Sequence, residues 1–285
     1  MTKRLKEHLA GRLKDWELKI LPSSYDVIGD IAVIKIPGAL KHRAKMIAEA
    51  IMQINGHVHT VLNQASPVSG DFRLRRLEWV MGEKKTETIH KEHGCLFKVD
   101  LEKCYFSPRL SFERARIARQ VKPSEIVVNM FAGVGCFSIL IAKKSEAKKI
   151  YSIDINPYAI RYAKENVILN RVEHAVKPML GDAKNIIEEK LEGAADRVLM
   201  PLPEKAYKYI DFAVEALKPG IGIIHYYDFT HAGRGENPID KVRGRISRKL
   251  RLLKVDFEVY FGRIVRTVGP RWFQIVLDIM VNKNN

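Results

Sequence analysis

The first 110 residues mix helical and strand patterns of apolar side chains. Residues 2–20 predict one amphipathic helix, because apolar side chains recur there at helical spacing, namely Leu5, Leu9, Leu13 and Trp16. β-branched residues over 24–37, interrupted at Gly29-Asp30, predict two strands and a turn. We expect a helix over 41–54, a strand over 57–62 and a hairpin formed by 86–90 and 95–99. Residues 1–110 therefore predict an α+β domain.

From residue 110 onward, strand and helix patterns alternate. Expected strands cover 126–130, 150–153, 198–202 and 222–227, and expected helices cover 110–121, 137–144, 157–170 and 205–217. Two further strands, 257–266 and 272–281, are joined through Gly269-Pro270. This alternation is typical of a parallel, doubly wound sheet. Residues 111–285 therefore predict a Rossmann-like α/β domain, preceded by the smaller α+β domain.

Composition points to a soluble protein with a polyanionic partner. The 285 residues carry a formal net charge of +16, and residues 234–271 hold eleven Lys/Arg against four Asp/Glu. Such a surface attracts nucleic acid, although a lysine-rich surface is also common in thermophile proteins. No apolar run reaches the ~18 residues of a membrane span, and the basic N-terminus is not a secretory signal. We expect a cytoplasmic, monomeric protein.

The cysteines do not predict a metal site. Cys95, Cys104 and Cys136 form no Cys-x-x-Cys pair, and a structural zinc ion needs about four closely spaced ligands. Reduced, structural thiols and no metal are expected.

A glycine pair after the first predicted strand of the second domain indicates a cofactor. Gly133-Val-Gly135 lacks the third glycine of the dinucleotide fingerprint, which favours S-adenosylmethionine over a pyrophosphate cofactor. Asp154 follows 21 residues after Gly133, the spacing at which a carboxylate meets ribose hydroxyls, and Asp182 ends a third strand. The alternative is a bare strand-turn-helix bend with Asp154 capping the next helix. The expected cofactor contacts are Phe131, Gly133, Gly135, Asp154, Ile155, Asp182, Ala183 and Met200.

Several segments make the chain recognisable. They span nearly the whole sequence and include Gly70-Asp-Phe-Arg-Leu-Arg75, Thr88-Ile-His-Lys-Glu-His-Gly94, Tyr105-Phe-Ser-Pro-Arg-Leu110, Glu113-Arg-Ala-Arg-Ile117 and Ile223-Ile-His-Tyr-Tyr227. In these segments the chain resembles the archaeal class of tRNA (guanine-37 N1)-methyltransferases. The resemblance implies an RNA-contacting N-terminal domain and a Rossmann-like class I methyltransferase domain.

The resemblance also implies roles for individual residues. Glu113 matches the general base that removes the proton of guanine N1, and Arg73 matches the arginine that stabilises the charge developing towards O6. Tyr105 and Phe106 are expected to line the pocket of a base that leaves its stack. Two plain alternatives exist: Glu113 pairs with Arg116 along the helix, and Arg73 is a solvated arginine.

The chain departs from the family pattern at three positions. Pro201, in Met200-Pro-Leu-Pro203, stands where the family usually has the asparagine of Asn-Leu-Pro, beside the reactive methyl group. Proline supplies neither the side-chain amide nor a backbone donor, so this loop bears on which atom is methylated. Asn129 stands where the family usually has Asp, and Cys136 where it has Pro.

RNA contacts are expected on both domains. From the resemblance, we expect the chain to lack the extra N-terminal domain of longer relatives and to contact phosphates of the tRNA anticodon stem-loop through its basic C-terminal stretch. Lys249 and Arg251 belong to that stretch, and the predicted RNA contacts are Tyr105, Arg109, Arg114, Arg243, Arg245 and Arg248.

Three functions fit these patterns. The first is methylation of guanosine 37 at N1. The second keeps fold and cofactor but is a wyosine-pathway reaction, either aminocarboxypropyl transfer or methylation of a wyosine precursor. The third is a non-catalytic tRNA-binding paralogue in which Pro201 has ended catalysis.

Overall fold

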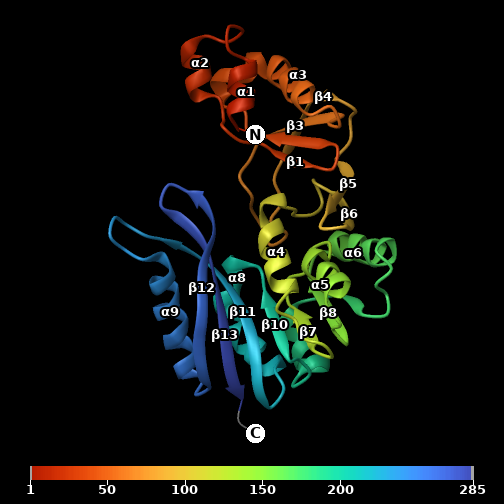
Figure 1. Cartoon of the computed structure of the whole chain (residues 1–285), viewed down its shortest axis with the longest axis vertical. Coiled ribbons are helices and arrows are strands. Elements are labelled where there is room, and N and C mark those ends of the chain that lie inside the picture. Colours follow the sequence, from red (N-terminus) through yellow and green to blue (C-terminus); the bar gives the residue numbers. More distant parts are fainter. Residues whose placement is uncertain (1, 284–285) are drawn as a thin grey trace. The chain divides into compact units, whose positions relative to one another are not determined.

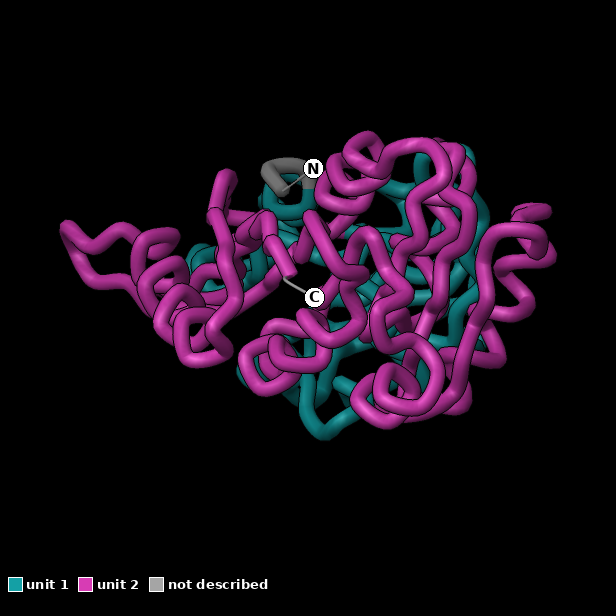
Figure 2. The backbone as a smooth tube through the Cα atoms, turned by 90° about the horizontal axis from the view of Figure 1, so that it is seen from below, with its two compact units in different colours: residues 1–108 teal, residues 109–285 magenta. Residues whose placement is uncertain are grey.

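The structure is a computed structural model that describes residues 2–283, and it divides into two compact units, residues 1–108 and 109–285 (Figure 2). Each unit has its own sheet and its own hydrophobic core. The division lies at Pro108, two residues before the boundary expected from the sequence.

The first unit is an α+β structure built on a four-stranded sheet. Its helices are α1 (Thr2–His8), α2 (Asp15–Ile20), η1 (Gly38–Arg43) and α3 (Ala44–Ile54). The sheet has the order β1-β2-β3-β4, with β1 (Asp26–Ile28), β2 (Ile31–Ile34), β3 (Thr60–Gln64) and β4 (Leu77–Gly82). A separate hairpin pairs β5 (Glu87–Glu92) with β6 (Cys95–Asp100), and the short η2 (Pro108–Leu110) follows.

The predicted single helix over 2–20 is wrong. The apolar spacing is real, since Leu5, Leu9 and Leu13 are all buried in one core. The chain nevertheless turns between α1 and α2, where Gly11 has φ +81°, a conformation that glycine adopts without steric cost. The periodicity continues through the turn because both helices cover the same core.

Other elements of the first unit follow the sequence more closely. The hairpin is confirmed within a residue or two at each end. The strand expected at 57–62 begins at Thr60, and β4 was not predicted.

The second unit is a doubly wound α/β sheet, as predicted (Figure 1). The strand order is β12-β13-β11-β10-β7-β8-β9, and the strands from β11 to β9 run parallel. Their bounds are β7 (Ile126–Asn129), β8 (Lys149–Asp154), β9 (Val176–Leu180), β10 (Arg197–Met200), β11 (Gly220–His231), β12 (Asp256–Gly269) and β13 (Trp272–Lys283). The last two are the antiparallel pair expected at the C-terminus.

Helices cover both faces of this sheet. They are α4 (Ser111–Ala118), α5 (Cys136–Lys144), α6 (Pro157–Leu169), α7 (Ala183–Ile186) continuing into η3 (Ile187–Leu191), α8 (Pro203–Ala216) and α9 (Pro238–Leu252). Buried side chains of α7, α8 and α9 share one core with Ile224 and Tyr226 of β11. His225 and Tyr227 point to the opposite face, where they meet α4 and its ion pairs.

The strand order fixes where a ligand belongs. Chain order reverses between β7 and β10, which are neighbours in the sheet. In open α/β sheets a ligand binds at the carboxyl ends of the strands beside such a reversal. The loop after β7 and the loop after β10 both lie there.

Candidate cofactor and catalytic site

The glycine loop forms a sharp turn between β7 and α5. Gly133 and Gly135 have φ +56° and +90°, values that a side chain disfavours. A Cβ on Gly135 would also lie 3.0 Å from Cδ1 of Ile139. Asn129 stabilises the turn. Its Oδ1 accepts from the amide of Phe131 at 3.4 Å, and its Nδ2 donates to Oγ of Ser138 at 3.1 Å.

Asp154 ties the neighbouring strand to this loop. Its carboxylate accepts from the amide of Gly133 at 2.7 Å and from that of Asn156 at 2.9 Å, and burial raises its pKa. The helix cap is Asn156 instead, whose Oδ1 accepts from the amide of Tyr158 at 3.0 Å. The alternative in which Asp154 merely caps α6 is therefore wrong.

Apolar side chains flank the carboxylate. Ile155 is 48% exposed and Leu180 57% exposed, and β8 and β9 pair directly at Asp154 and Leu180. Exposed aliphatic groups beside a carboxylate and a tight glycine turn fit the adenine and ribose of S-adenosylmethionine. Leu180 was not predicted, although it is an apolar residue at a strand end directly before Gly181-Asp182.

The remaining predicted cofactor contacts have visible structural roles. Asp182 caps α7 through the amide of Lys184 at 2.9 Å and accepts from the hydroxyl of Tyr209 at 2.8 Å. Tyr209 in turn meets Phe131 edge-on, with ring centroids 5.4 Å apart. Ala183 and Met200 are buried, the latter at the end of β10. Their contact with the cofactor stays a prediction.

Glu113 is buried on α4 and surrounded by donors. Arg116 donates to its Oε1 through Nη2 at 2.7 Å and through Nε at 3.1 Å, and to its Oε2 through Nε at 3.0 Å. Tyr227 donates to Oε1 at 2.7 Å, and Nη1 of Arg263 lies 3.6 Å from Oε2. The helical Glu113–Arg116 pair is thus present, and it holds the carboxylate in place inside the protein.

Tyr227 connects this carboxylate to the glycine loop. Tyr226 pairs with Met200, the last residue of β10, so Tyr227 lies one step beyond that strand, where the Pro201 loop begins. The ring of Tyr227 also meets Phe137, in the first turn of α5, with centroids 6.3 Å apart. The candidate base and the cofactor loop therefore share this edge of the sheet.

A chain of buried ion pairs extends from Glu113 under the sheet. Arg116 donates to Asp278 at 2.5 and 3.0 Å, and Asp278 accepts from Nδ1 of His225 at 2.6 Å. Nε2 of His225 accepts from Arg197 at 2.7 Å, and Arg197 is bidentate to Glu125 at 2.7 and 2.9 Å. Both ring nitrogens are thereby used in the neutral form of His225. Beyond the Glu113–Arg116 pair, none of these ion pairs was predicted.

The pKa shifts of His225 and Asp278 favour the same protonation state of this pair. Burial lowers the pKa of His225, and the hydrogen bond to Asp278 only partly offsets it. Burial alone would raise the pKa of Asp278, but hydrogen bonds from His225 and Arg116 hold it well below its usual range. Asp278 is therefore an anion and His225 a neutral donor.

Arg73 and Tyr105 come together in the first unit. The guanidinium carbon of Arg73 lies 4.1 Å from the centroid of the Tyr105 ring, a cation–π distance. Arg73 has φ +55°, so its backbone is held in a region uncommon for a non-glycine residue. Phe106 is buried and packs edge-on against His90.

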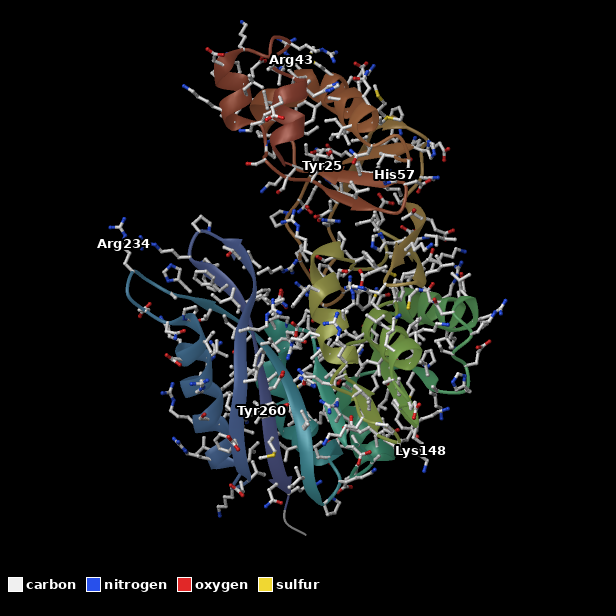
Figure 3. The ribbon with its side chains drawn as sticks, viewed as in Figure 1. Tyr25, Arg43, His57, Lys148, Arg234 and Tyr260 are labelled. Carbon is white, nitrogen blue, oxygen red and sulfur yellow. The ribbon has the colours of Figure 1, made fainter. Side chains whose placement is uncertain are left out.

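The predicted RNA contacts divide by exposure. Arg109, Arg243 and Arg248 are exposed. Arg114 is only 3% exposed, and Arg245 is engaged with Asp228 and with the carbonyl of Phe229. Burial and pairing disfavour these last two as phosphate contacts. Arg234, which was not predicted, is exposed on the loop between β11 and α9 (Figure 3).

Residues 2–283 contain neither a membrane-spanning helix nor a cluster of metal ligands. No helix there is long and apolar enough to cross a membrane. No group of three or more His, Cys, Asp or Glu side chains in that range is arranged to hold a metal ion.

Known proteins are similar to both units of this chain. The TRM5/TYW2 methyltransferase domain matches residues 88–256 and the TYW2 N-terminal domain matches residues 5–86. The tRNA (guanine(37)-N(1))-methyltransferase Trm5b of Pyrococcus abyssi is 42% identical over 93% of this chain and 76% of that protein. Its crystal structure superposes with a TM-score of 0.84, at 40% identity over 95% of this chain and 78% of that one.

Relatives with other reactions are also similar. The tRNA 4-demethylwyosine(37)-methyltransferase Taw21 of Saccharolobus solfataricus is 41% identical over 90% of this chain and 93% of that protein. A solved Methanocaldococcus jannaschii TYW2 in complex with AdoMet has a TM-score of 0.69, at 29% identity over 91% of this chain and all of that one. An aminocarboxypropyltransferase of that organism is 34% identical over 89% of this chain and 96% of its own length.

These matches confirm the predicted fold and cofactor, a Rossmann-like domain that uses S-adenosylmethionine. The chain belongs to the TRM5/TYW2 methyltransferase family.

Proposed function

We propose that this protein transfers a methyl group from S-adenosylmethionine to N1 of guanosine 37 in tRNA. The observation that supports this most is the Glu113 carboxylate, buried at the edge of the sheet that carries the glycine loop and linked to that loop through Tyr227 and Phe137. A second support is the 42% identical relative from Pyrococcus abyssi, which is named as a tRNA (guanine(37)-N(1))-methyltransferase.

The chemistry requires a base and a cation. Guanine N1 carries a proton and becomes nucleophilic only when Glu113 accepts it. Negative charge then spreads towards O6, and the guanidinium of Arg73 is proposed to stabilise it. When bound, S-adenosylmethionine supplies the methyl group that N1 takes up. Glu113 afterwards releases its proton to water.

The substrate is proposed to be the anticodon stem-loop of tRNA. The target base must leave its stack to reach a buried carboxylate, and the Arg73–Tyr105 pair offers a flat, cationic surface for it. The net charge of +16 favours the polyanion as a whole.

A second candidate is a wyosine-pathway reaction on the same nucleotide, and Pro201 favours it. The loop after β10 lacks the amide side chain and the backbone donor that the usual asparagine supplies. Taw21 and the aminocarboxypropyltransferase are both close in sequence. Pro201 is therefore the residue to examine if guanosine is not the substrate.

Nucleoside mass separates these candidates. The protein is incubated with labelled cofactor and either unmodified tRNA or tRNA that carries 4-demethylwyosine. The proposal expects one added carbon on guanosine 37, with the rate in Glu113→Ala lower by roughly two to four powers of ten. A four-carbon addition, or methylation of the wyosine precursor alone, supports the second candidate. Binding without turnover on either RNA indicates a non-catalytic paralogue.

A further inference from the structure

Arg263 of β12 lies beside Glu113 because of the register of three strands. Tyr227 pairs with Val276 of β13, and Val276 pairs with Arg263 of β12. Directly paired residues of a sheet point to the same face. Tyr227 and Arg263 thus reach Glu113 from the same face of the sheet, with one strand between them.

The two oxygens of Glu113 differ in what they can still accept. Oε1 receives three hydrogen bonds, two from Arg116 and one from Tyr227. Oε2 receives one, from Nε of Arg116 at 3.0 Å. Nη1 of Arg263 lies 3.6 Å from Oε2, which is an ion-pair distance but too long for a hydrogen bond. Oε2 is therefore the oxygen suited to receive a substrate proton.

Arg263 is also the most accessible of these three partners. Its side chain is 28% exposed, against 12% for Arg116, while Tyr227 is buried. Its guanidinium carbon stacks 4.6 Å from the centroid of Phe112, which is 62% exposed. Arg116, by contrast, is committed to Glu113 and to Asp278. Among the described residues, the unused donor beside Oε2 is therefore Nη1 of Arg263, whose Nε donates to the carbonyl of Ile264 at 3.4 Å.

We propose that Arg263 is a further catalytic residue, donating a hydrogen bond to O6 of the target guanine while Oε2 of Glu113 accepts the N1 proton. N1–H and O6 are neighbouring groups on one edge of guanine, a donor next to an acceptor. Oε2 and Nη1 present the complementary pair, an acceptor next to a donor. The negative charge that remains on N1 and O6 when the proton departs then develops directly against a guanidinium. This inference rests on the proposed function of Glu113.

Arg263→Gln and Arg263→Lys test the assignment in the 285-residue chain. Single-turnover methylation is measured on tRNA with guanosine 37 and on tRNA with 6-thioguanosine 37, whose sulfur is a weaker hydrogen-bond acceptor than O6. Arg161→Gln is the matched control, because Arg161 likewise pairs with a carboxylate, Glu165 at 3.0 Å, and lies over a ring, Tyr162 at 5.4 Å.

We expect Arg263→Gln to slow transfer to guanosine about 100-fold, with Arg263→Lys intermediate. On 6-thioguanosine the penalty of Arg263→Gln shrinks to a few-fold, because the hydrogen bond it removes is already weak. Calorimetric affinity for S-adenosylmethionine stays unchanged in both variants, which shows that the unit is folded. Arg161→Gln behaves as wild type on both RNAs.

Three results overturn the assignment in distinguishable ways. A wild-type rate in Arg263→Gln removes Arg263 from the reaction and leaves the proposed function intact. An equal penalty on both RNAs shows that Arg263 only holds Glu113 in place. Wild-type protein that forms no N1-methylguanosine overturns the proposed function, and this inference with it.

Discussion

The hydroxyl of Tyr227 is a permanent donor to Glu113. Burial raises its pKa well above the usual value, so the group keeps its proton and can only donate to Oε1 at 2.7 Å. Tyr227→Phe removes that bond without removing the ring contact with Phe137. A hydrogen bond to a charged group contributes roughly 1.5–3 kcal/mol, so we expect single-turnover transfer to fall about tenfold or more while cofactor affinity holds. A rate within twofold of wild type contradicts this role.

His225 makes stability depend on pH. Its lowered pKa keeps it neutral in the folded protein, whereas in the unfolded chain it binds a proton below about pH 6.5. The unfolded state then holds more protons, so the free energy of unfolding falls as pH falls below about 6.5, by at most about 1.4 kcal/mol per unit for this group.

His225→Asn tests this, because an amide can also donate to Asp278 and accept from Arg197. The variant loses the His225 part of the pH dependence. The free energy of unfolding is measured with denaturant at pH 7 and pH 5. The difference in this free energy between wild type and variant should be smaller at pH 5 by up to about 2 kcal/mol. A gap that is the same at both pH values shows that His225 is not the group that titrates.

Some of these residues could be predicted from the sequence and others could not, because only some of them belong to a local sequence pattern. Glu113 and Arg73 stand inside short, recognisable segments. Asp278 and His225 are 53 residues apart in the chain and meet only because β11 and β13 pair. The register that places Arg263 beside Glu113 likewise depends on three strands, and no local pattern reports it.

At the scale of elements, α9 separates its basic residues into two groups. Val242, Ile246 and Leu250 are buried in the core, so the opposite face is exposed. Arg248 and Arg251 lie on it, and Arg243 is exposed at its flank, where it pairs with Asp240 at 3.3 Å. Arg245 and Lys249, which the sequence placed in the same phosphate-binding set, are instead engaged with Asp228 and Asp211.

Neutralising Arg243, Arg248 and Arg251 to Gln should therefore weaken tRNA binding and flatten its salt dependence. Each lost phosphate contact lowers the slope of log affinity against log salt by about 0.7–0.9. The control replaces Lys143, Lys144 and Lys148, which are exposed at the end of α5 and the start of β8. That is the amino edge of the sheet, and Lys148 is marked in Figure 3. Equal slopes for the two triple variants would remove α9 from the RNA-binding surface.

The ends of helices were hardest to predict where the apolar periodicity continues past them. The apolar spacing of residues 2–20 gave no sign that α1 ends at His8, because residues 9–14 keep contributing to the same core. Gly11 was the local signal for a turn. By contrast, the strand-helix alternation of the second unit is set by burial on both faces of the sheet, so its parallel strands were predicted to within a few residues.

At the scale of the whole molecule, the two units divide the proposed chemistry. Every candidate cofactor contact, together with Glu113 and Arg263, lies in residues 109–285, whereas Arg73 and Tyr105 lie in residues 1–108. The second unit has a complete sheet and its own core. Cofactor binding should thus be separable from methyl transfer.

A fragment of residues 109–285 should then bind S-adenosylmethionine with an affinity within a few-fold of the full chain, yet fail to methylate tRNA. Calorimetry with the cofactor and a single-turnover assay with tRNA measure the two properties separately. If the folded fragment does not bind the cofactor, residues 1–108 contribute to that site. If it methylates tRNA at the full rate, Arg73 and Tyr105 are not part of the reaction. The cation beside O6 must then come from the second unit, where Arg263 lies next to the Glu113 carboxylate.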